Sequence, residues 1–209
     1  MIGIIIFTDI KGSVLLWNKH KNVFFKKLIT LNKKIKNLLN KYNGLLIKEI
    51  GDSCMIYFDK DKKLEALSFM IDIQKYLNET NFSIKNDKIT IRIGCSYGKM
   101  NKKKNIIQKC NLLDFYGINV NTASRLESKI CKEGGFAIYN IDILKYIDLL
   151  DINLKNYFNN NFIINKINKK IFKTKINKKR SSKLIYFPNK VKDIIFNKNL
   201  LYNIKPINN

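Results

Sequence analysis

The sequence predicts an α+β fold whose core has the order βαββαβ, with an antiparallel sheet covered by helices on one face. Three observations predict it. A dense apolar run opens the chain, a long stretch with helical spacing follows, and a Gly-Asp pair then separates two short apolar runs. A second helical stretch and a β-rich segment complete the order. Two helices on one face of such a sheet form the ferredoxin-like arrangement.

The first strand and the first helix come from the N-terminal forty residues. Residues 3–8 are rich in Ile and Phe, which is typical of a strand buried on both faces. Asp9 and Gly12 end this run. We expect Ser13 to cap a single long helix that reaches about Tyr42, because apolar residues recur there at helical spacing.

A hairpin is predicted next. Residues 45–50 and 53–58 are short apolar runs, and Gly51-Asp52 between them is a strong turn signal. Asp52 is therefore expected at the hairpin tip.

The remaining elements follow from weaker patterns. The second helical stretch and the strand after it are expected over residues 64–77 and 88–97. We then expect an exposed polar excursion, a helix, a strand, a helix and a last strand, over residues 99–111, 120–130, 136–139, 141–149 and 183–187. Residues 197–209 are expected to fray.

Composition narrows the class of protein. The chain has 209 residues, enough for one substantial core. The apolar run at residues 1–7 is too short to cross a bilayer, so we expect no membrane span. The four cysteines are scattered without paired spacing, which argues against a zinc site or a disulfide framework and favours a cytoplasmic location.

The net charge of +24 by itself suggests a nucleic acid or an anionic membrane surface as partner. Lys, Asn and Ile are over-used together, however, also where no functional pattern exists. We interpret this as a coding bias spread over the surface, which argues against a nucleic-acid partner. The C-terminal part is the most basic, since residues 151–209 hold 14 basic and 2 acidic residues.

Two carboxylates are predicted to meet at one end of the sheet. Asp9 ends a buried strand and precedes a glycine turn into a helix, whose backbone amides can hold phosphate oxygens. Asp52 lies on the hairpin whose strands neighbour that first strand. Two unpaired carboxylates would repel each other, so shared cations are a natural role, although each aspartate alone also fits a structural turn.

A third signal lies on the predicted helix after residue 117. Asn121 and Arg125 are four residues apart and share one face, so an amide and a guanidinium can point into one site. A solvated helix face explains the same spacing.

Together these segments resemble a known family, the class III adenylate and guanylate cyclases. The resemblance is carried by four ordered motifs, FTDIKGS, KEIGDSCM, RIGCSYG and DFYGINVNTASRLES, and covers about residues 2–140. It implies the class III nucleotidyl cyclase type of fold. It divides the chain into a catalytic domain over residues 1–188 and a basic C-terminal tail over residues 189–209.

The resemblance also implies roles for individual residues. Asp9 and Asp52 would bind two divalent cations, Mg or Mn, assisted by the backbone carbonyl of Ile10. Asn121 would orient the ribose and Arg125 would neutralise charge on the transferring phosphorus. Further contacts with the substrate are implied for Phe7, Gly12 and Ser13.

Lys48 and Asp114 would read the purine. An ammonium can donate to adenine N1 and a carboxylate can accept from the 6-amino group, whereas guanine presents the opposite polarity. Guanylate members of the family typically have Glu and Cys at these places. The pair therefore favours ATP, and the implied product is 3′,5′-cyclic AMP.

Each site in this family forms across a dimer, so a chain holding all six positions implies a homodimer with two sites. The sequence departs from the family at Val14, where a threonine is usual, and in the segment that supplies a phosphate-binding lysine. We assign that role to Arg180, although a solvated charge run also explains it.

Several alternatives remain open at this stage. A guanylate or pyrimidine nucleotide cyclase would use the same machinery. Palm-type polymerases and diguanylate cyclases share the fold order, but they lack the motif from Asp114 to Arg125. A basic nucleic-acid-binding module and a catalytically silent nucleotide sensor are the options from other classes.

Overall fold

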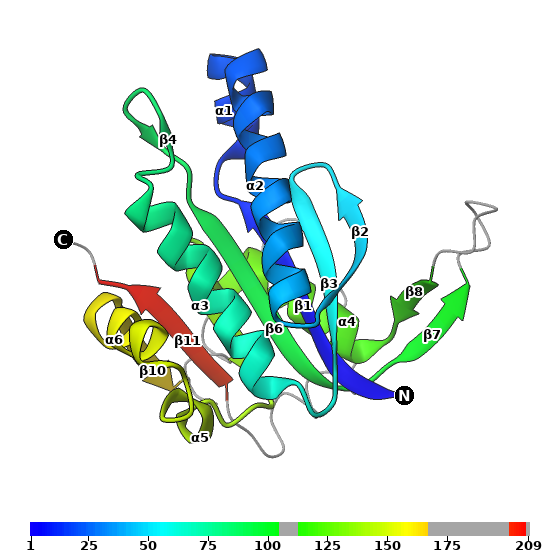
Figure 1. The fold of residues 1–209 in the computed structure, drawn as a ribbon. Helices are drawn as coiled ribbons and strands as arrows, with labels where there is room; N and C mark the ends of the chain where they lie inside the picture. Colours follow the sequence, from blue (N-terminus) through cyan, green and yellow to red (C-terminus); the bar gives the residue numbers. More distant parts are fainter. Residues whose placement is uncertain (105–112, 167–200, 208–209) are drawn as a thin grey trace, which may run out of the picture.

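The computed structural model describes residues 1–104, 113–166 and 201–207. Figure 1 shows a central sheet with helices packed across it. The βαββαβ core consists of β1 (Ile2–Ile10), α1 (Ser13–His20), α2 (Asn22–Lys41), β2 (Leu45–Ile50), β3 (Ser53–Asp59), α3 (Lys63–Glu79) and β6 (Ile91–Lys99). The elements outside this core are β4 (Ser83–Ile84), β5 (Asp87–Lys88), β7 (Asn101–Lys104), β8 (Leu113–Tyr116), α4 (Ile118–Arg125), the π-helix η1 (Leu126–Ile130), β9 (Gly135–Tyr139), α5 (Leu144–Ile147), α6 (Ile152–Asn161), β10 (Phe162–Lys166) and β11 (Leu201–Pro206).

The sheet confirms the predicted α+β fold. Its order is β10-β11-β9-β6-β1-β3-β2, and all neighbours are antiparallel except β6 and β9. β1 lies between β3 and β6, with Thr8 opposite Cys54 on one side and Asp9 opposite Arg92 on the other. A strand with neighbours on both sides and cover on both faces has to be apolar throughout, which explains its Ile-rich sequence.

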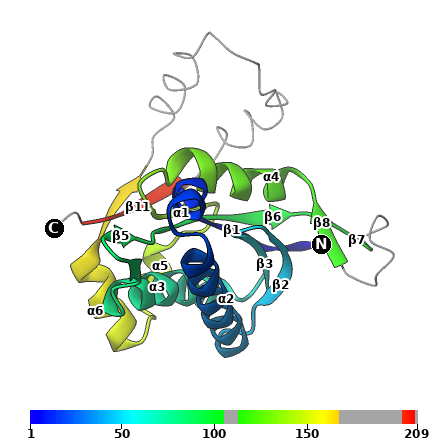
Figure 2. The same cartoon turned by 90° about the horizontal axis from the view of Figure 1, so that it is seen from above.

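The two faces of the sheet are covered by different helices. Alternate β1 residues Ile4, Ile6 and Ile10 belong to the core cluster that includes residues of α2 and α3. Ile5 belongs to a separate cluster with residues of α4 and β8. Figure 2 shows α4 on one side of the sheet and α2, α3, α5 and α6 on the other. α2 and α3 thus cover one face, as predicted, and α4 covers the other.

The single long helix expected over residues 13–42 is wrong, because it is two helices. Lys21 joins them with φ 42°, and its amide donates to the carbonyl of Trp17 over 2.9 Å, closing the last turn of α1. The break lets Trp17 and Phe24 pack edge to face with ring centroids 5.2 Å apart. Apolar spacing alone does not reveal such a change of direction.

The expected fraying of residues 197–209 is also wrong for part of that segment. β11 pairs with both β9 and β10 in the main sheet, and Tyr202 and Ile204 are buried. The apolar residues of β11 are interrupted by Asn203 and Lys205, so its sequence gives a weak strand signal, and the strand depends on neighbours that are distant in the sequence. The expected strand at 183–187 and the boundary at residue 188 lie outside the described residues, and that boundary stays a prediction.

Three smaller expectations need adjustment. The polar excursion after β6 starts as strand β7, which pairs with β8 in a two-stranded sheet. The helix expected over 120–130 is α4 followed by η1, and the helix expected over 141–149 is limited to α5. In residues 1–104, 113–166 and 201–207, no helix is long and apolar enough to cross a membrane.

Candidate active site

Asp9 and Asp52 lie at the same end of the sheet. Asp9 is near the end of β1, and Asp52 is in the turn between β2 and β3. The backbone amide of Ile10 donates to Oδ2 of Asp52 over 3.3 Å, and the Ser53 hydroxyl donates to Oδ1 of Asp9 over 2.5 Å. Antiparallel pairing of β1 with β3 therefore brings together two carboxylates that are 43 positions apart in the sequence.

The electrostatics of this pair suit a divalent cation. Burial raises the pKa of the Asp52 carboxyl, the Ser13 hydroxyl opposes the rise, and the charge of Asp9 adds to it. Carboxylate oxygens are the hard ligands that Mg²⁺ and Mn²⁺ prefer, and a cation would relieve the repulsion between them. In the described part of the chain, no group of three or more His, Cys, Asp and Glu side chains could hold a metal ion.

Arg92 is the positive group next to the pair. It lies opposite Asp9 on β6, and its guanidinium donates to Oδ2 of Asp9. On its other side, Arg92 Nε is 2.9 Å from Oε1 of Glu127, an ion pair that is close without being aligned as a hydrogen bond. Burial raises the pKa of Glu127 to about 7, Arg92 opposes the rise, and the charges of Asp9 and Asp52 add to it.

The turn into α1 forms a backbone cradle beside the carboxylates. Gly12 has φ 69°, a left-handed conformation that favours glycine, and its carbonyl accepts from Leu15 and Leu16 over 3.0 and 3.1 Å. The expectation that Ser13 caps the helix is wrong, since Gly12 is the N-cap and no side chain caps this end. Ser13 is instead the first helical residue, and its hydroxyl interacts with Asp52.

Lys48 and Asp114 meet although 66 positions separate them. Lys48 Nζ donates to Oδ2 of Asp114 over 2.6 Å. The Asp114 side chain is 6% exposed and its Oδ1 also accepts from the Phe115 amide, whereas the Lys48 side chain is 37% exposed. The ammonium has donors left and the carboxylate has lone pairs left, so this pair can still bind a polar ligand edge.

Asn121 and Arg125 lie on α4, which is held tightly against the sheet. Asn121 is exposed and Arg125 is partly buried. A Cβ added at Gly94 would lie 2.1 Å from the carbonyl oxygen of Ala123, so this glycine allows α4 to lie directly on β6. The buried Asn119 side chain also bonds Ser96 on β6 through its oxygen and its amide.

Comparison with known proteins was decisive for the family. The model of the adenylate and guanylate cyclase catalytic domain matches residues 3–134, which is more than half of the chain. The chain belongs to this cyclase family.

Relatives of the cyclase domain support the same assignment. An adenylate cyclase of Schizosaccharomyces pombe is 27% identical over 162 residues, covering 70% of this chain and 9% of the relative. The adenylyl cyclase CyaB from P. aeruginosa has a similar fold, with a TM-score of 0.64 at 18% identity, covering 98% of this chain and 93% of the other. A non-canonical dimeric guanylyl cyclase domain of the RhoGC fusion protein from the aquatic fungus Blastocladiella emersonii gives a TM-score of 0.57 at 18% identity, covering 80% and 88%.

The matched region of the cyclase domain contains all of the candidate site residues except one. Phe7 is half-buried on β1 and packs against the cluster beneath α4. Arg180 lies outside the described residues, so its assignment stays a prediction.

Sequence reasoning missed Arg92, Ser53 and Glu127 as members of the site. Arg92 belongs to the RIGCSYG motif, but this motif alone does not place it beside Asp9, because that position depends on the register of β1 and β6. Glu127 lies just beyond the Asn121 and Arg125 pair, in η1. An acid two residues after that arginine was the available signal, but spacing alone does not show that it is buried.

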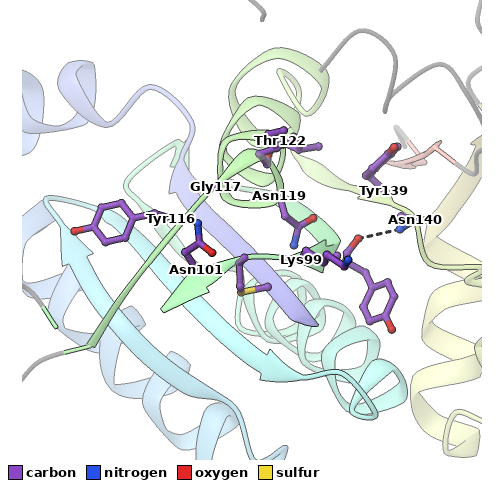
Figure 3. Close-up of a pocket in the computed structure, with 12 residues that line it drawn as sticks. Lys99, Asn101, Tyr116, Gly117, Asn119, Thr122, Tyr139 and Asn140 are labelled. Carbon is purple, nitrogen blue, oxygen red and sulfur yellow. Dashed lines mark hydrogen bonds between the residues drawn. The ribbon is translucent and has the colours of Figure 1, made fainter. Parts of the chain in front are cut away.

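A separate pocket of about 540 Å³ lies at the other end of β6. Figure 3 shows Lys99, Asn119, Tyr139 and Asn140 around it, and the Asn140 side chain donates to the Tyr97 carbonyl over 3.0 Å. Since Arg92 and Lys99 are seven residues apart on one strand, the pocket is roughly 23 Å from the carboxylate pair. The residues of the motif from Asp114 to Arg125 that also line this pocket are Tyr116, Gly117, Ile118, Asn119 and Thr122.

Proposed function

We propose that this cyclase domain is an adenylate cyclase that converts ATP into 3′,5′-cyclic AMP and pyrophosphate. The observation that carries the choice of nucleotide is the contact between Lys48 and Asp114. Their remaining donors and acceptors fit the N1 acceptor and the 6-amino donor of adenine. Guanine presents a donor and an acceptor at those edges and would leave both groups unmatched.

The reaction needs positioning and charge stabilisation more than covalent chemistry by the protein. The ribose 3′-oxygen forms a bond with the α-phosphorus, its proton passes to solvent water, and the bond between the α-phosphorus and the bridging oxygen of pyrophosphate breaks. Asn121 would orient the ribose, and Arg125 would stabilise the negative charge of the transition state. The amides at Gly12 and Ser13 would hold phosphate oxygens at the start of α1.

Asp9 and Asp52, with the Ile10 carbonyl, would hold two divalent cations, Mg or Mn. Such cations polarise phosphoryl oxygens and lower the pKa of a coordinated hydroxyl. Arg92 would then be free to turn from Asp9 towards a phosphate, because a guanidinium matches the geometry of phosphate as well as that of carboxylate. Glu127 would hold the other side of this guanidinium.

We also propose that the active form is a homodimer. All six positions are present in one chain, and the exposed Asn121 side chain is accessible to a second subunit. The metal aspartates would come from one subunit and Lys48, Asp114, Asn121 and Arg125 from the other. The dimeric RhoGC domain shows that a related fold can assemble in pairs.

The first experiment tests whether the chain is a cyclase. Asp52→Asn keeps the shape of the side chain and removes its charge, so cyclic AMP formation with Mg²⁺ or Mn²⁺ should fall at least roughly 100-fold. Asp61→Asn, at an exposed acid outside the site, is the matched control and should keep wild-type turnover. Equal product from wild type and Asp52→Asn would defeat the enzyme assignment.

The second experiment tests the nucleotide. The wild type should form product from ATP in preference to GTP, CTP and UTP. The double variant Lys48→Glu with Asp114→Cys should shift the product ratio towards cyclic GMP. The double change is required, because Lys48→Glu alone would place two carboxylates in contact. A wild type that prefers GTP or a pyrimidine nucleotide would replace the adenylate assignment.

The third experiment tests the dimer by mixing inactive chains. Asp9→Ala and Arg125→Ala should each be inactive alone. A mixture should regain activity, because a heterodimer holds one site with neither change. Failure to recover, with the mixed dimer shown by native mass spectrometry, would contradict shared sites.

A further inference from the structure

The segment that contains α1 and α2 is rich in lysine and has no acidic residue of its own. Residues 10–48 contain ten lysines and neither Asp nor Glu, and no Arg. The helix on the same face of the sheet is different, since α3 (Lys63–Glu79) carries two lysines and three acids. Residues 152–192 of the sequence also contain no Asp or Glu, so charge alone does not single out α1 and α2.

The same surface exposes large apolar side chains. Trp17, Phe25 and Ile29 are 39%, 48% and 39% exposed, and the Trp17 and Phe25 rings have centroids 6.1 Å apart. Phe25, Ile29, Lys33 and Lys36 follow the spacing i, i+4, i+8 and i+11, which places them along one exposed side of α2. We refer to these five residues as the α1–α2 patch.

The patch lies on a projecting part of the molecule. Figure 1 shows α1 and the N-terminal end of α2 extending beyond the strands at the top of the view. Val14 and Leu15 are also exposed on α1, at 70% and 74%. They follow the Gly12 turn directly, so we exclude them from the patch and from its test.

We propose that the α1–α2 patch binds the surface of a membrane that contains anionic lipid. Aromatic and aliphatic side chains beside lysines are the composition of helices that lie in the interface, with the apolar groups entering the headgroup and acyl boundary. Residues 10–48 contain ten lysines and no arginine, and lysine is a flexible point charge that suits a diffuse anionic surface more than bidentate recognition. This mode of binding needs no membrane-spanning helix.

Charge and side-chain type favour a membrane surface over a second copy of the chain and over a nucleic acid as the partner of this patch. In a symmetric contact, a second copy of the chain would place the same lysines against this patch. A nucleic acid would favour aromatic rings for base stacking over an aliphatic side chain such as Ile29. An acidic protein remains as the competing outcome of the experiment.

The test is co-sedimentation of the full chain with vesicles. Wild type should bind phosphatidylcholine vesicles that contain about 30% phosphatidylserine, should not bind pure phosphatidylcholine, and should be released by about 0.5 M salt. Lys33→Gln with Lys36→Gln should weaken binding roughly 30-fold, at about five-fold per lysine. Phe25→Ser with Ile29→Ser should weaken binding at unchanged charge, while cyclic AMP formation without vesicles stays at the wild-type level.

Two matched pairs serve as controls. Lys60→Gln with Lys145→Gln makes the same charge change away from α1 and α2, and Leu144→Ser with Leu149→Ser removes two exposed apolar side chains of similar size. Both control proteins should bind vesicles like the wild type, and all variants should keep the wild-type melting temperature.

Four results would overturn the proposal. They are absence of binding to the anionic vesicles, equal losses in the patch variants and their controls, binding of poly-glutamate with no binding of vesicles, and a shift from dimer to monomer in Phe25→Ser with Ile29→Ser. The third result would indicate an acidic protein as partner, and the fourth would indicate an interface between copies.

Discussion

Gly94 provides the sharpest test of how the fold positions the active site. It lies in β6 directly beneath α4, the helix that carries Asn121 and Arg125. A Cβ at this position would lie 2.1 Å from the Ala123 carbonyl oxygen and 2.4 Å from the Glu127 backbone nitrogen. Both obstacles are backbone atoms, so a rotamer change cannot relieve the clash and α4 would have to move away from the sheet.

The expected cost of Gly94→Ala follows from that geometry. Overpacking of a core typically costs about 1–3 kcal/mol, and a backbone obstacle belongs at the upper end. For a domain of this size, about 3 kcal/mol corresponds to a melting temperature lower by roughly 6–12 °C. Displacing α4 by about 1 Å would also misplace Asn121 and Arg125, which should reduce turnover roughly 100-fold.

The control is Gly98→Ala on the same strand. Its Cβ would meet the Asn119 side-chain oxygen at 3.2 Å, so the displacement needed is far smaller than at Gly94 and involves no backbone atom. Thermal unfolding and cyclic AMP formation should be measured for both variants at equal protein concentration. If Gly94→Ala melted and turned over like Gly98→Ala, the argument that β6 sets the position of α4 would be refuted.

Three further predictions concern the surroundings of the site. The pKa of Glu127 is raised from its ordinary value of 4.5 to about 7, so between these pH values the folded chain binds more protons than the unfolded chain. The free energy of unfolding should therefore fall as pH rises from 4.5 to 7. Urea titrations should show a weaker pH dependence in Glu127→Gln, and the same pH dependence in both proteins would contradict this prediction. Phe115 is stacked on Tyr57 with ring centroids 4.7 Å apart, and it adjoins Asp114. Phe115→Ala should therefore lower the free energy of unfolding by about 3–5 kcal/mol and raise the KM for ATP. An unchanged KM would show that the stacked rings do not contribute to nucleotide binding. Ser96→Ala removes the hydroxyl that donates to the buried Asn119 oxygen, so the free energy of unfolding measured by chemical denaturation should fall by about 1–3 kcal/mol. A loss below about 0.5 kcal/mol, the usual range of a neutral substitution, would show that another donor replaces the Ser96 hydroxyl.

Local patterns in the sequence determined the strands and helices that stand next to each other along the chain. The Ile-rich run of β1 and the Gly51-Asp52 turn have signals within a few residues, because burial on two faces and tight turns each restrict residue choice. Two of the four cyclase motifs lie in these same segments, and the family match confirmed the resemblance that the four motifs predicted.

The tertiary structure alone decided which distant groups touch. The register of β1 against β6 places Arg92 on Asp9, and the packing of α4 and η1 buries Glu127 beside them. β11 is a strand because β9 and β10 lie on either side of it and supply its hydrogen-bond partners. Its own sequence, interrupted by Asn and Lys, does not predict a strand. A sequence pattern records what one residue requires from its surroundings on average, whereas register and packing depend on partners brought close by the whole chain.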